Sequence, residues 1–380
     1  MQMTSSIERS PPAFFFTDTA AHVTGKIITD GKGKVGIHGV SELSIDRIKR
    51  ALDGNVSCTV DEFSTGYLRG CFVTCAGEVH LLLTCDDNQV LNDTELFTQS
   101  LDSEMNLEIQ GFAKLFSIAA FEEYDFPIFN AILECYYEVV AAKNKLAVRD
   151  VYDHRIRNSF LYLSGRFEKL WRKEPFHARN HLDWFAWIYH IEISAIATIL
   201  GTEQPLVLHD VATNTAFWPC LLATSDRKYL HGIRAREVSC SDVDVNQISS
   251  TIETLRNAFD GLEAVRPMYL DVTEPSSLLN RADVITANDI LEHFHQEVSF
   301  KVLNNLWRST RRLLVIHVPF EDRPVAAFGH YTGFDRTKLS SWAAQLDDCR
   351  DRSEELRHLT RGHPDPDAIH KFLVLERISQ

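Results

Sequence analysis

The carboxyl-terminal half of the chain alternates short apolar runs with stretches of helical period. Beyond Gly201, the apolar runs lie at residues 206–210, 237–242, 268–271, 282–288 and 313–319. Segments with helical spacing lie between them, for example at 217–223 and 248–259. Strands that are separated by helices of about ten residues join through right-handed crossovers into a parallel sheet. The pattern therefore predicts an α/β fold with a mostly parallel, doubly wound sheet.

Polar residues stand where these apolar runs end. They are Asp210, Asp242, Asp271 and the neighbouring Asn288 and Asp289. A parallel sheet binds its ligand at the carboxyl ends of its strands, so these side chains are candidates for binding. Carboxylates accept hydrogen bonds from a ribose diol, an exocyclic amine and an ammonium group, so the set indicates an adenosyl ligand with an amino-acid tail. The competing interpretation is turn chemistry, because Asp is common where a strand leaves a sheet.

Four segments resemble the successive motifs of class I S-adenosylmethionine-dependent methyltransferases. They are 206–223 (LVLHDVATNTAFWPCLLA), 238–242 (VSCSD), 268–272 (MYLDV) and 282–294 (ADVITANDILEHF), and their order is also similar to that of the family. The resemblance covers about 180 of the 380 residues, all of them carboxyl-terminal. It implies a Rossmann-like methyltransferase domain with S-adenosyl-L-methionine as its cofactor.

The same resemblance implies roles for the residues at the first two strand ends. Asp210 would open the loop that supports the methionine end of the cofactor, and Ala212 and Asn214 belong to that loop. Asp242 would accept hydrogen bonds from the ribose hydroxyls. The spacing from Asp210 to Asp242 is about ten residues longer than the family usually has, so Asp244 is the alternative ribose partner.

The resemblance also implies contacts from the next two strand ends. Asp271 would accept a hydrogen bond from the adenine amine, and Val272 would pack on the base. Ala287 and Asn288 would line the floor of the site near the sulfonium. These residues, together with Asp210, Ala212, Asn214 and Asp242, make up the expected cofactor site.

The loop after the first apolar run has no glycine. Where the family has D-x-G-x-G-x-G, residues 210–216 read DVATNTA. Glycine is favoured in such a loop because the backbone approaches the ligand and because a positive φ angle strains other residues. Ala212 and Ala216 are the smallest substitutes, and Asn214 is among the residues that best tolerate a left-handed backbone. We therefore expect the loop to keep its shape.

Three residues are expected to be catalytic, namely Asp289, His293 and His330. A histidine whose pKa lies near neutrality can take a proton from a hydroxyl or an amine as a methyl group arrives. Glu292 and His293 are expected on the helix after the fourth run, and His330 lies in segment 318–335, which resembles the pocket-closing loop of many small-molecule methyltransferases. His317 ranks after them. The alternative interpretation is that these histidines are ordinary surface residues.

The remaining residues divide by their periodicity. Residues 1–100 contain short strands and turns around one helix capped by Ser44, which predicts a small α+β domain. Residues 101–200 have helical spacing and are expected to form a substrate-binding or lid region over the carboxyl edge of the sheet. Residues 201–380 are expected to form the cofactor-binding domain.

Neither a metal site nor a membrane span is predicted. His177 and His181 have the i, i+4 spacing of a metal site, but no third ligand stands at a diagnostic offset. The apolar stretch His181–Leu200 includes Asp183 and Glu192, and an ionisable group in mid-bilayer costs a few kcal/mol. The cysteines form no C-x-x-C pair and the first residues hold no signal-peptide core, which predicts a cytoplasmic protein with reduced thiols.

Charge narrows the expected partners. The chain has 39 basic and 53 acidic residues, a formal charge of −14. Such a field repels phosphate backbones and anionic lipid, so we expect a small-molecule substrate and neither nucleic acid nor membrane as a partner. The sequence leaves the oligomeric state open, and a homodimer is among the states it allows.

The sequence thus favours an S-adenosylmethionine-dependent methyltransferase of biosynthesis that acts on a small molecule, in particular a specialised metabolite. One alternative is a catalytically silent scaffold or interaction subunit with the same fold. Another is an enzyme that uses the same cofactor for a reaction other than methylation. A nicotinamide dehydrogenase is disfavoured because the first loop lacks G-x-G-x-x-G.

Overall fold

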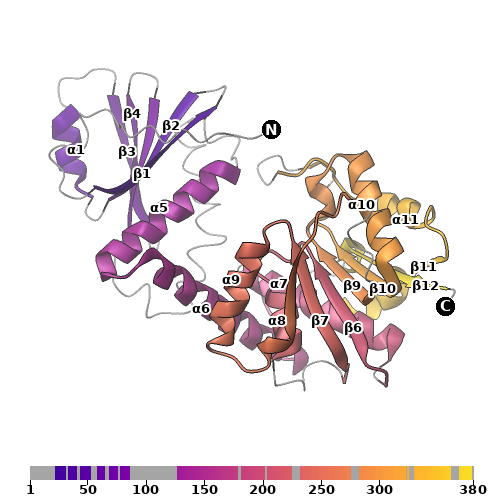
Figure 1. Cartoon of the computed structure of the whole chain (residues 1–380). Helices are drawn as coiled ribbons and strands as arrows, with labels where there is room; N and C mark the ends of the chain where they lie inside the picture. The colour runs from indigo at the N-terminus through magenta and orange to yellow at the C-terminus, as the bar shows by residue number, and fades with distance from the viewer. Residues whose placement is uncertain are drawn as a thin grey trace. The chain divides into compact units, whose positions relative to one another are not determined.

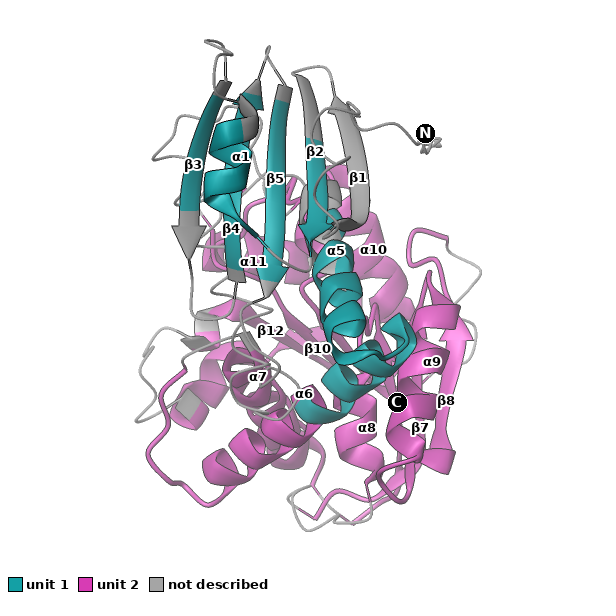
Figure 2. Ribbon diagram, turned by 90° about the vertical axis from the view of Figure 1, so that its left-hand side faces the viewer, with its two compact units in different colours: residues 1–158, 326–328 teal, residues 159–325, 329–380 magenta. Residues whose placement is uncertain are grey.

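The computed structural model describes residues 22–30, 33–40, 43–52, 58–64, 68–75, 78–85, 126–178, 181–201, 203–224, 232–274, 282–321, 323–324, 329–360 and 368–378. The chain divides into two compact units, residues 1–158 with 326–328 and residues 159–325 with 329–380 (Figure 2). The domain limits expected near residues 100 and 200 stay predictions.

The first unit contains a five-stranded sheet with the strand order β1-β2-β5-β4-β3. The strands are β1 (His22–Asp30), β2 (Gly33–Val40), β3 (Cys58–Ser64), β4 (Leu68–Cys75) and β5 (Glu78–Cys85). Only β2 and β5 run parallel among these neighbours. Helix α1 (Ile45–Leu52) packs against β3, and α5 (Phe126–Asn144) packs against β1, β2 and β5. The predicted α+β architecture is confirmed here.

Alternation of side chains along the strands builds the core of this first unit. Cys71 and Val73 of β4 are fully buried and pack with Leu82 of β5. Val40 at the end of β2 and Ile48 of α1 complete the cluster. Residues two apart on a strand share a face, so β4 and β5 direct the same face of the sheet toward α1.

The second unit contains a seven-stranded sheet with the strand order β11-β12-β10-β9-β6-β7-β8 (Figure 1). The strands are β6 (Leu206–Val211), β7 (Ala235–Asp242), β8 (Val265–Tyr269), β9 (Ala282–Asn288), β10 (Thr310–His317), β11 (Cys349–Asp351) and β12 (Phe372–Arg377). The five neighbouring strands β8, β7, β6, β9 and β10 run parallel to one another, whereas β12 is antiparallel to both β10 and β11. This is a Rossmann-like α/β fold, so the predicted fold class is confirmed.

Helices connect and cover this second sheet. They are α8 (Phe217–Ala223), α9 (Val245–Arg256), α10 (Gln296–Ser309) and α11 (Arg336–Ala343), with the 3₁₀ turns η3 (Leu262–Ala264), η4 (Leu291–His293), η6 (Ser353–Thr360) and η7 (Ala368–Lys371). Ile285 of β9 and Leu314 of β10 are buried, because central parallel strands are covered on both faces.

Two segments differ from their predicted limits for local reasons. Helix α9 begins at Val245 rather than at residue 248, because the Asp244 side chain accepts a hydrogen bond from the Gln247 amide and caps the helix. The segment around Glu292 and His293, expected on the helix after the fourth strand, is the separate 3₁₀ turn η4, and α10 begins only at Gln296.

The long helix α6 (Val148–Trp171) precedes α7 (His181–Leu200), which packs against β10. Asp183 is fully buried in α7, and its carboxylate lies 2.5 Å from Nε of Arg166 and 3.0 Å from the Tyr162 hydroxyl. This pairing explains one of the two acids in this mostly apolar helix. Within the described ranges, no helix combines the length and apolar character that a membrane crossing requires.

Candidate cofactor-binding and acceptor site

The order of the seven strands defines where a ligand of this fold lies. The chain proceeds outward from β6 to β7 and β8, then returns to the other side of β6 as β9 and continues to β10. The reversal falls between the neighbouring parallel strands β6 and β9. Near the carboxyl ends of these strands, Asp210 of β6 is paired with Thr286 of β9. Doubly wound sheets bind ligands in the crevice at such a reversal, beyond the carboxyl ends of the strands.

The loop that leaves β6 has a left-handed backbone at every second residue. The φ angles are 54° at Ala212, 48° at Asn214 and 53° at Ala216, and none of these residues is glycine. They occupy the positions where the motif cited above has glycine. The loop therefore keeps the expected shape, at a cost of roughly 1 kcal/mol or more for each left-handed L-residue.

Asp210 is held at the base of this loop. Its carboxylate accepts hydrogen bonds from the hydroxyls of Thr213, at 2.5 Å, and Thr286, at 2.7 Å. Burial raises the pKa of Asp210 to about 7, the two hydroxyls act in the opposite direction, and the charge of Asp242 raises it further. The preceding residue, His209, lies between the hydroxyls of Ser239 and Ser241, and burial lowers its pKa to about 4.

Asp242, at the end of β7, joins the β6 loop to the next strand. One carboxylate oxygen accepts from the Asn214 amide at 3.0 Å, and the other accepts from the Asp244 amide at 3.1 Å. The Asn214 side chain in turn accepts from Gln247 of α9. The structure thus brings together Asp210, Asn214 and Asp242, three of the residues expected to bind cofactor.

Asp271 and Val272, which follow the third strand, have their contacts within their own turn and in the core. The Asp271 carboxylate accepts from the amide and the hydroxyl of Thr273 in its own turn, and these bonds lower its pKa. Val272 is 6% exposed and packs in the main core, while its carbonyl accepts from Asn305. Their roles toward an adenine stay predictions.

A group of buried polar atoms lies against the reversal point. Glu192 of α7 is 0% exposed, and neither carboxyl oxygen has a hydrogen-bond partner among the described residues. The same holds for the indole nitrogen of Trp218 and for Oδ1 of Asn288. Burial raises the pKa of Glu192 well above its usual value and Asp210 raises it further, while the nearby side chains of Asn288 and Trp218 oppose the shift without completing a hydrogen bond.

Tyr189 lies one helical turn before Glu192 and belongs to the same environment. It is buried, and its pKa rises well above the usual value through burial and through the charges of Asp210, Glu192 and Asp289. Three acids therefore act on one buried phenol. The interior at this end of the sheet is therefore strongly acidic. The groups that shift the pKa of Glu192 include acids but no cation.

Asp289, one of the three expected catalytic residues, is paired with His317. Asp289 has a left-handed backbone with φ of 49°, and its carboxylate lies 2.8 Å from Nδ1 of His317. The Asp289 amide also donates to the His317 carbonyl. His317 is the last residue of β10 and packs on Phe372. The Asp289–His317 pair therefore connects the residue that follows β9 to the end of β10.

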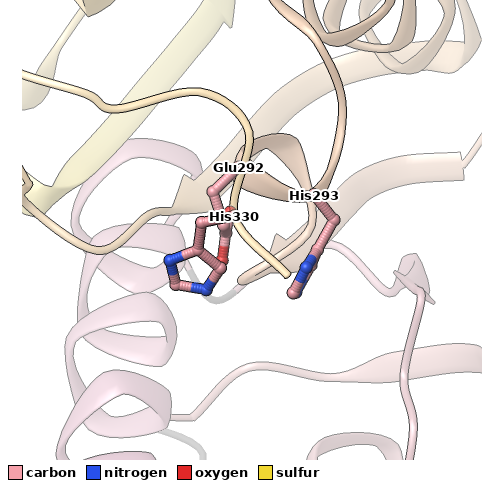
Figure 3. Close-up of side chains that lie close together, drawn as sticks. All are labelled: Glu292, His293 and His330. Atoms are coloured by element: carbon pink, nitrogen blue, oxygen red, sulfur yellow. The ribbon is translucent and has the colours of Figure 1, made fainter. Parts of the chain in front are cut away.

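The two expected catalytic histidines come together from η4 and from the segment after β10. The rings of His293 and His330 have centroids 5.1 Å apart, and Glu292 lies with them (Figure 3). Amides of Tyr331 and Thr332 donate to the Glu292 carbonyl at 2.7 and 3.1 Å, which ties the loop after β10 to η4. These contacts bring together residues that stand 37 to 40 positions apart.

Glu292 is the buried member of this group. It is 0% exposed, and both of its carboxyl oxygens lack a hydrogen-bond partner within the described part of the chain. Burial raises the pKa of Glu292 to about 9, with further contributions from the charges of Asp289 and Glu321. Burial lowers the pKa of His293, and the neighbouring His330 lowers it further.

A depression of about 900 Å³ lies at the opposite edge of the sheet. Its lining includes Asp283 and Thr310, which stand at the start of β9 and β10, and Arg377 of β12. The Arg377 guanidinium already donates to the carbonyls of Thr310 and Trp307. Because ligands of this fold bind at the carboxyl ends of the strands, we assign the site to the other edge.

Sequence reasoning missed several residues of the candidate site. Glu192 was treated only as an argument against a membrane span, Tyr189 belonged only to the expected lid region, and Trp218 and Glu321 received no individual role. One signal was available, since an acid within the apolar stretch of α7 needs a partner or a function. His177 and His181 gained no support as a metal pair, and the His181 side chain lies outside the described residues.

Comparison with known proteins yields similarity only at the level of structure. No protein-family model and no curated protein matches the sequence. The [4+2]-cyclase SpnF is 15% identical with a TM-score of 0.35, over 61% of this chain and 96% of its own. Magnesium protoporphyrin IX methyltransferase ChlM from Synechocystis PCC 6803, solved with bound S-adenosylhomocysteine, is 15% identical with a TM-score of 0.33, over 58% and 98%. The N-methyltransferase NodS from Bradyrhizobium japonicum WM9, also solved with S-adenosylhomocysteine, is 10% identical with a TM-score of 0.35, over 58% and 99%.

These scores are low, and the fold assignment rests on the strand order of the second unit rather than on them. That order and the run of parallel strands agree with a Rossmann-like α/β domain, as the sequence motifs predicted. Fold alone does not establish function, so the chemistry must come from the residues at the carboxyl edge.

Proposed function

We propose that this protein is an S-adenosyl-L-methionine-dependent methyltransferase that acts on a small-molecule acceptor. The observation that carries the proposal is the acidic reversal point, where Asp210 and Glu192 lie buried beneath a loop with three left-handed residues. Such a loop brings its backbone close to a ligand, and the acids beneath it favour a ligand that is positively charged.

The residues present fit this cofactor on charge. S-adenosyl-L-methionine has a sulfonium and an ammonium, both positive. The unpartnered carboxyl oxygens of Glu192 and the raised pKa of Asp210 indicate carboxyl groups that lack a cation. A cationic ligand would favour their ionised form and offset the cost of burying them.

Each expected residue takes a place in this site. Asp210, Ala212 and Asn214 would hold the methionine end, Asp242 would accept from the ribose hydroxyls, and Asn288 would offer its unpartnered Oδ1 near the sulfonium. When bound, the cofactor would supply an electrophilic methyl group to the acceptor atom. Asp271 and Val272 would meet the adenine.

The acceptor side of the site would be formed by Asp289, His293 and His330. These follow β9 and β10, so they lie beyond the strands nearest the expected sulfonium position. Much of the rate in a direct displacement comes from holding nucleophile and methyl group in line, and the aromatic residues of α7 are proposed to exclude water there. The net charge of −14 favours a small molecule over nucleic acid or membrane as the acceptor.

The described cysteines suit a reducing, cytoplasmic setting. Cys71, Cys135, Cys220 and Cys240 are buried and form no disulfide with another described residue, and burial raises the pKa of Cys71 to about 12. Thiols in this state are inert and need no disulfide partner. We propose a cytoplasmic location on this ground.

Titration of the full chain with S-adenosylhomocysteine in a calorimeter tests the proposal. We expect saturable binding of one ligand per chain and no binding of NAD⁺, which shares the adenosine but lacks the amino-acid tail. A folded chain that binds no S-adenosylhomocysteine at millimolar concentration would contradict the proposal and support the scaffold alternative. Binding without methyl transfer to any member of a small-molecule panel would support the non-methylating alternative.

A further inference from the structure

We propose that Glu292, His293 and His330 form a binding site for one divalent transition-metal ion. One ligand atom from each of the three side chains lies within 4.8 Å of the others (Figure 3). The three residues come from η4 and from the loop after β10, and they are distinct from the residues proposed to hold the cofactor. The inference does not depend on methyl transfer.

The burial of Glu292 supports a bound cation. Its side chain is 0% exposed and neither carboxyl oxygen has a hydrogen-bond partner among the described residues. Buried polar groups in proteins are almost always satisfied, and an unmatched one is destabilising. The carboxylates of Asp289 and Glu321 lie close enough to add negative potential at the same point. A cation would give the Glu292 carboxylate the partner that it lacks.

The orientation of the two imidazole rings also supports a bound metal ion. Nδ1 of His330 lies 3.0 and 3.2 Å from the carboxylate oxygens of Glu321. Nδ1 of His293 lies 3.2 Å from the Gly329 carbonyl. Each Nδ1 therefore carries the proton and donates it to an acceptor, which puts the lone pair of each neutral ring on Nε2, the form that binds a metal. Metal-binding histidines are oriented in this manner, by a carboxylate or a main-chain carbonyl behind the ring.

The loop that delivers His330 is held in place by its backbone. Gly329 has a φ angle of 71°, which glycine adopts without strain. After His330, the amides of Tyr331 and Thr332 donate to the Glu292 carbonyl, and the Thr332 hydroxyl donates to the Phe294 carbonyl. The ligand from the loop is thus fixed to the segment that carries the other two ligands.

The ligand set indicates the kind of ion. Two imidazole nitrogens and one carboxylate suit zinc, iron and similar ions, whereas magnesium and calcium prefer oxygen ligands. Bonds of about 2.0–2.2 Å require the three ligand atoms to move somewhat closer around the ion. Three protein ligands leave coordination positions open to water or to an exogenous ligand. Because both Nε2 lone pairs would bind the ion, neither histidine would then act as a free base.

The test is zinc binding by the full chain after exhaustive dialysis against a chelator. We expect one zinc ion per chain by calorimetry, and a rise in the melting temperature on its addition. Cobalt(II) in place of zinc should give visible absorption bands that report nitrogen and oxygen ligands. Glu292→Gln, His293→Asn and His330→Asn should each abolish this binding. Glu321→Gln retains all three ligands and should weaken binding about 10- to 100-fold.

His295→Asn is the matched control. His295 lies two residues after η4 and packs on Tyr331, yet it is outside the three-residue group, and Asn suits its N-cap position before α10. It should leave zinc affinity unchanged. Absence of saturable zinc binding by the parent chain would overturn the proposal, as would undiminished binding by a folded Glu292→Gln or Glu321→Gln. Circular dichroism without metal identifies a variant that fails to fold, and the S-adenosylhomocysteine titration reports on the cofactor site separately.

Discussion

The main-chain amide of Asn214 donates a hydrogen bond to the carboxylate of Asp242 across 3.0 Å, which connects the loop after β6 to the end of β7. The two residues stand 28 positions apart in the chain. One carboxylate therefore both shapes the left-handed loop and presents its remaining lone pairs at the place expected for a ribose.

Replacing Asp242 tests this double role. Asp242→Asn keeps one carbonyl oxygen but removes the charge, and we expect the affinity for S-adenosylhomocysteine to fall by about tenfold or more, since a hydrogen bond to a charged group contributes about 1.5–3 kcal/mol. Asp244→Asn is the control, because Asn caps a helix as well as Asp does. A loss of affinity in Asp244→Asn with an unchanged Asp242→Asn would transfer the ribose site to Asp244.

The left-handed backbone at Ala212 leads to a prediction about stability. Ala212→Gly relieves a positive φ angle, so we expect the free energy of unfolding to increase by about 1 kcal/mol. Ala212→Val places a β-branched side chain at the same φ angle of 54° and should be destabilising. Thermal unfolding of the two variants gives the comparison, and equal melting temperatures would show that the loop has relaxed from this conformation.

The buried carboxyls predict a decline in stability with rising pH. Glu192 and Asp210 have raised pKa values in the folded protein, so above the acid range the folded state retains protons that the unfolded chain has lost. Stability then falls as pH rises, by at most about 1.4 kcal/mol per pH unit for each such proton. For Asp210 this decline ends near its folded pKa of about 7, so a decline at higher pH reports on Glu192 and not on Asp210. His209 acts oppositely, but only between about pH 4 and 6.5, where its folded pKa of about 4 and its ordinary value lie.

The measurement is the melting temperature of the cofactor-free chain between pH 7 and pH 9, where the contribution of His209 is constant. We expect a steady decline, and a shallower one in Glu192→Gln, because the amide is neutral throughout. Glu203→Gln changes an exposed acid and should reproduce the slope of the parent chain. Identical slopes in all three proteins would mean that Glu192 is already ionised at pH 7.

The ion pair between Arg166 and Asp183 should matter strongly for stability. Removing one partner of a buried pair leaves the other charge uncompensated, so Asp183→Ala should cost about 3–5 kcal/mol. The exposed pair of Arg266 and Glu237 offers the contrast, with side chains 70% and 39% exposed. Glu237→Ala should change stability by less than about 1 kcal/mol. Chemical denaturation of both variants measures the difference.

The sequence was informative where structure follows from local rules. The period of apolar residues located β6, β7, β9 and β10, and the rule that ligands meet strand ends selected Asp210 and Asp242. Strand β8 was placed about three residues late, because the turn at Asp271 was taken as part of the strand. The pairing of the last strands could not be read in the same way, because the antiparallel β12 directly follows the 3₁₀ turn η7 rather than a crossover helix of regular period.

The site residues that sequence reasoning missed depend on contacts between distant segments. Glu192 faces Asn288 and Asp210 only because α7 packs on the sheet. Glu321 reaches His330 across a loop, and no periodic pattern marks that pairing. His293 and His330 were selected as individual candidates for a base, whereas their combination with Glu292 emerges only when η4 and the loop after β10 are seen together.

The position of β12 has a consequence for how the second unit assembles. The strand lies between β10 and β11, and in the described sheet β11 pairs with β12 alone. During synthesis, β11 is therefore made before the strand that it pairs with, and it has no partner in this sheet until residues 372–377 have been added. The exposed edge of β10 stays open to incorrect partners during that interval, because unpaired strand edges promote misassembly. Closure of this edge is thus a late event in biosynthesis, and a chain cut before Phe372 loses two strands of the sheet rather than one.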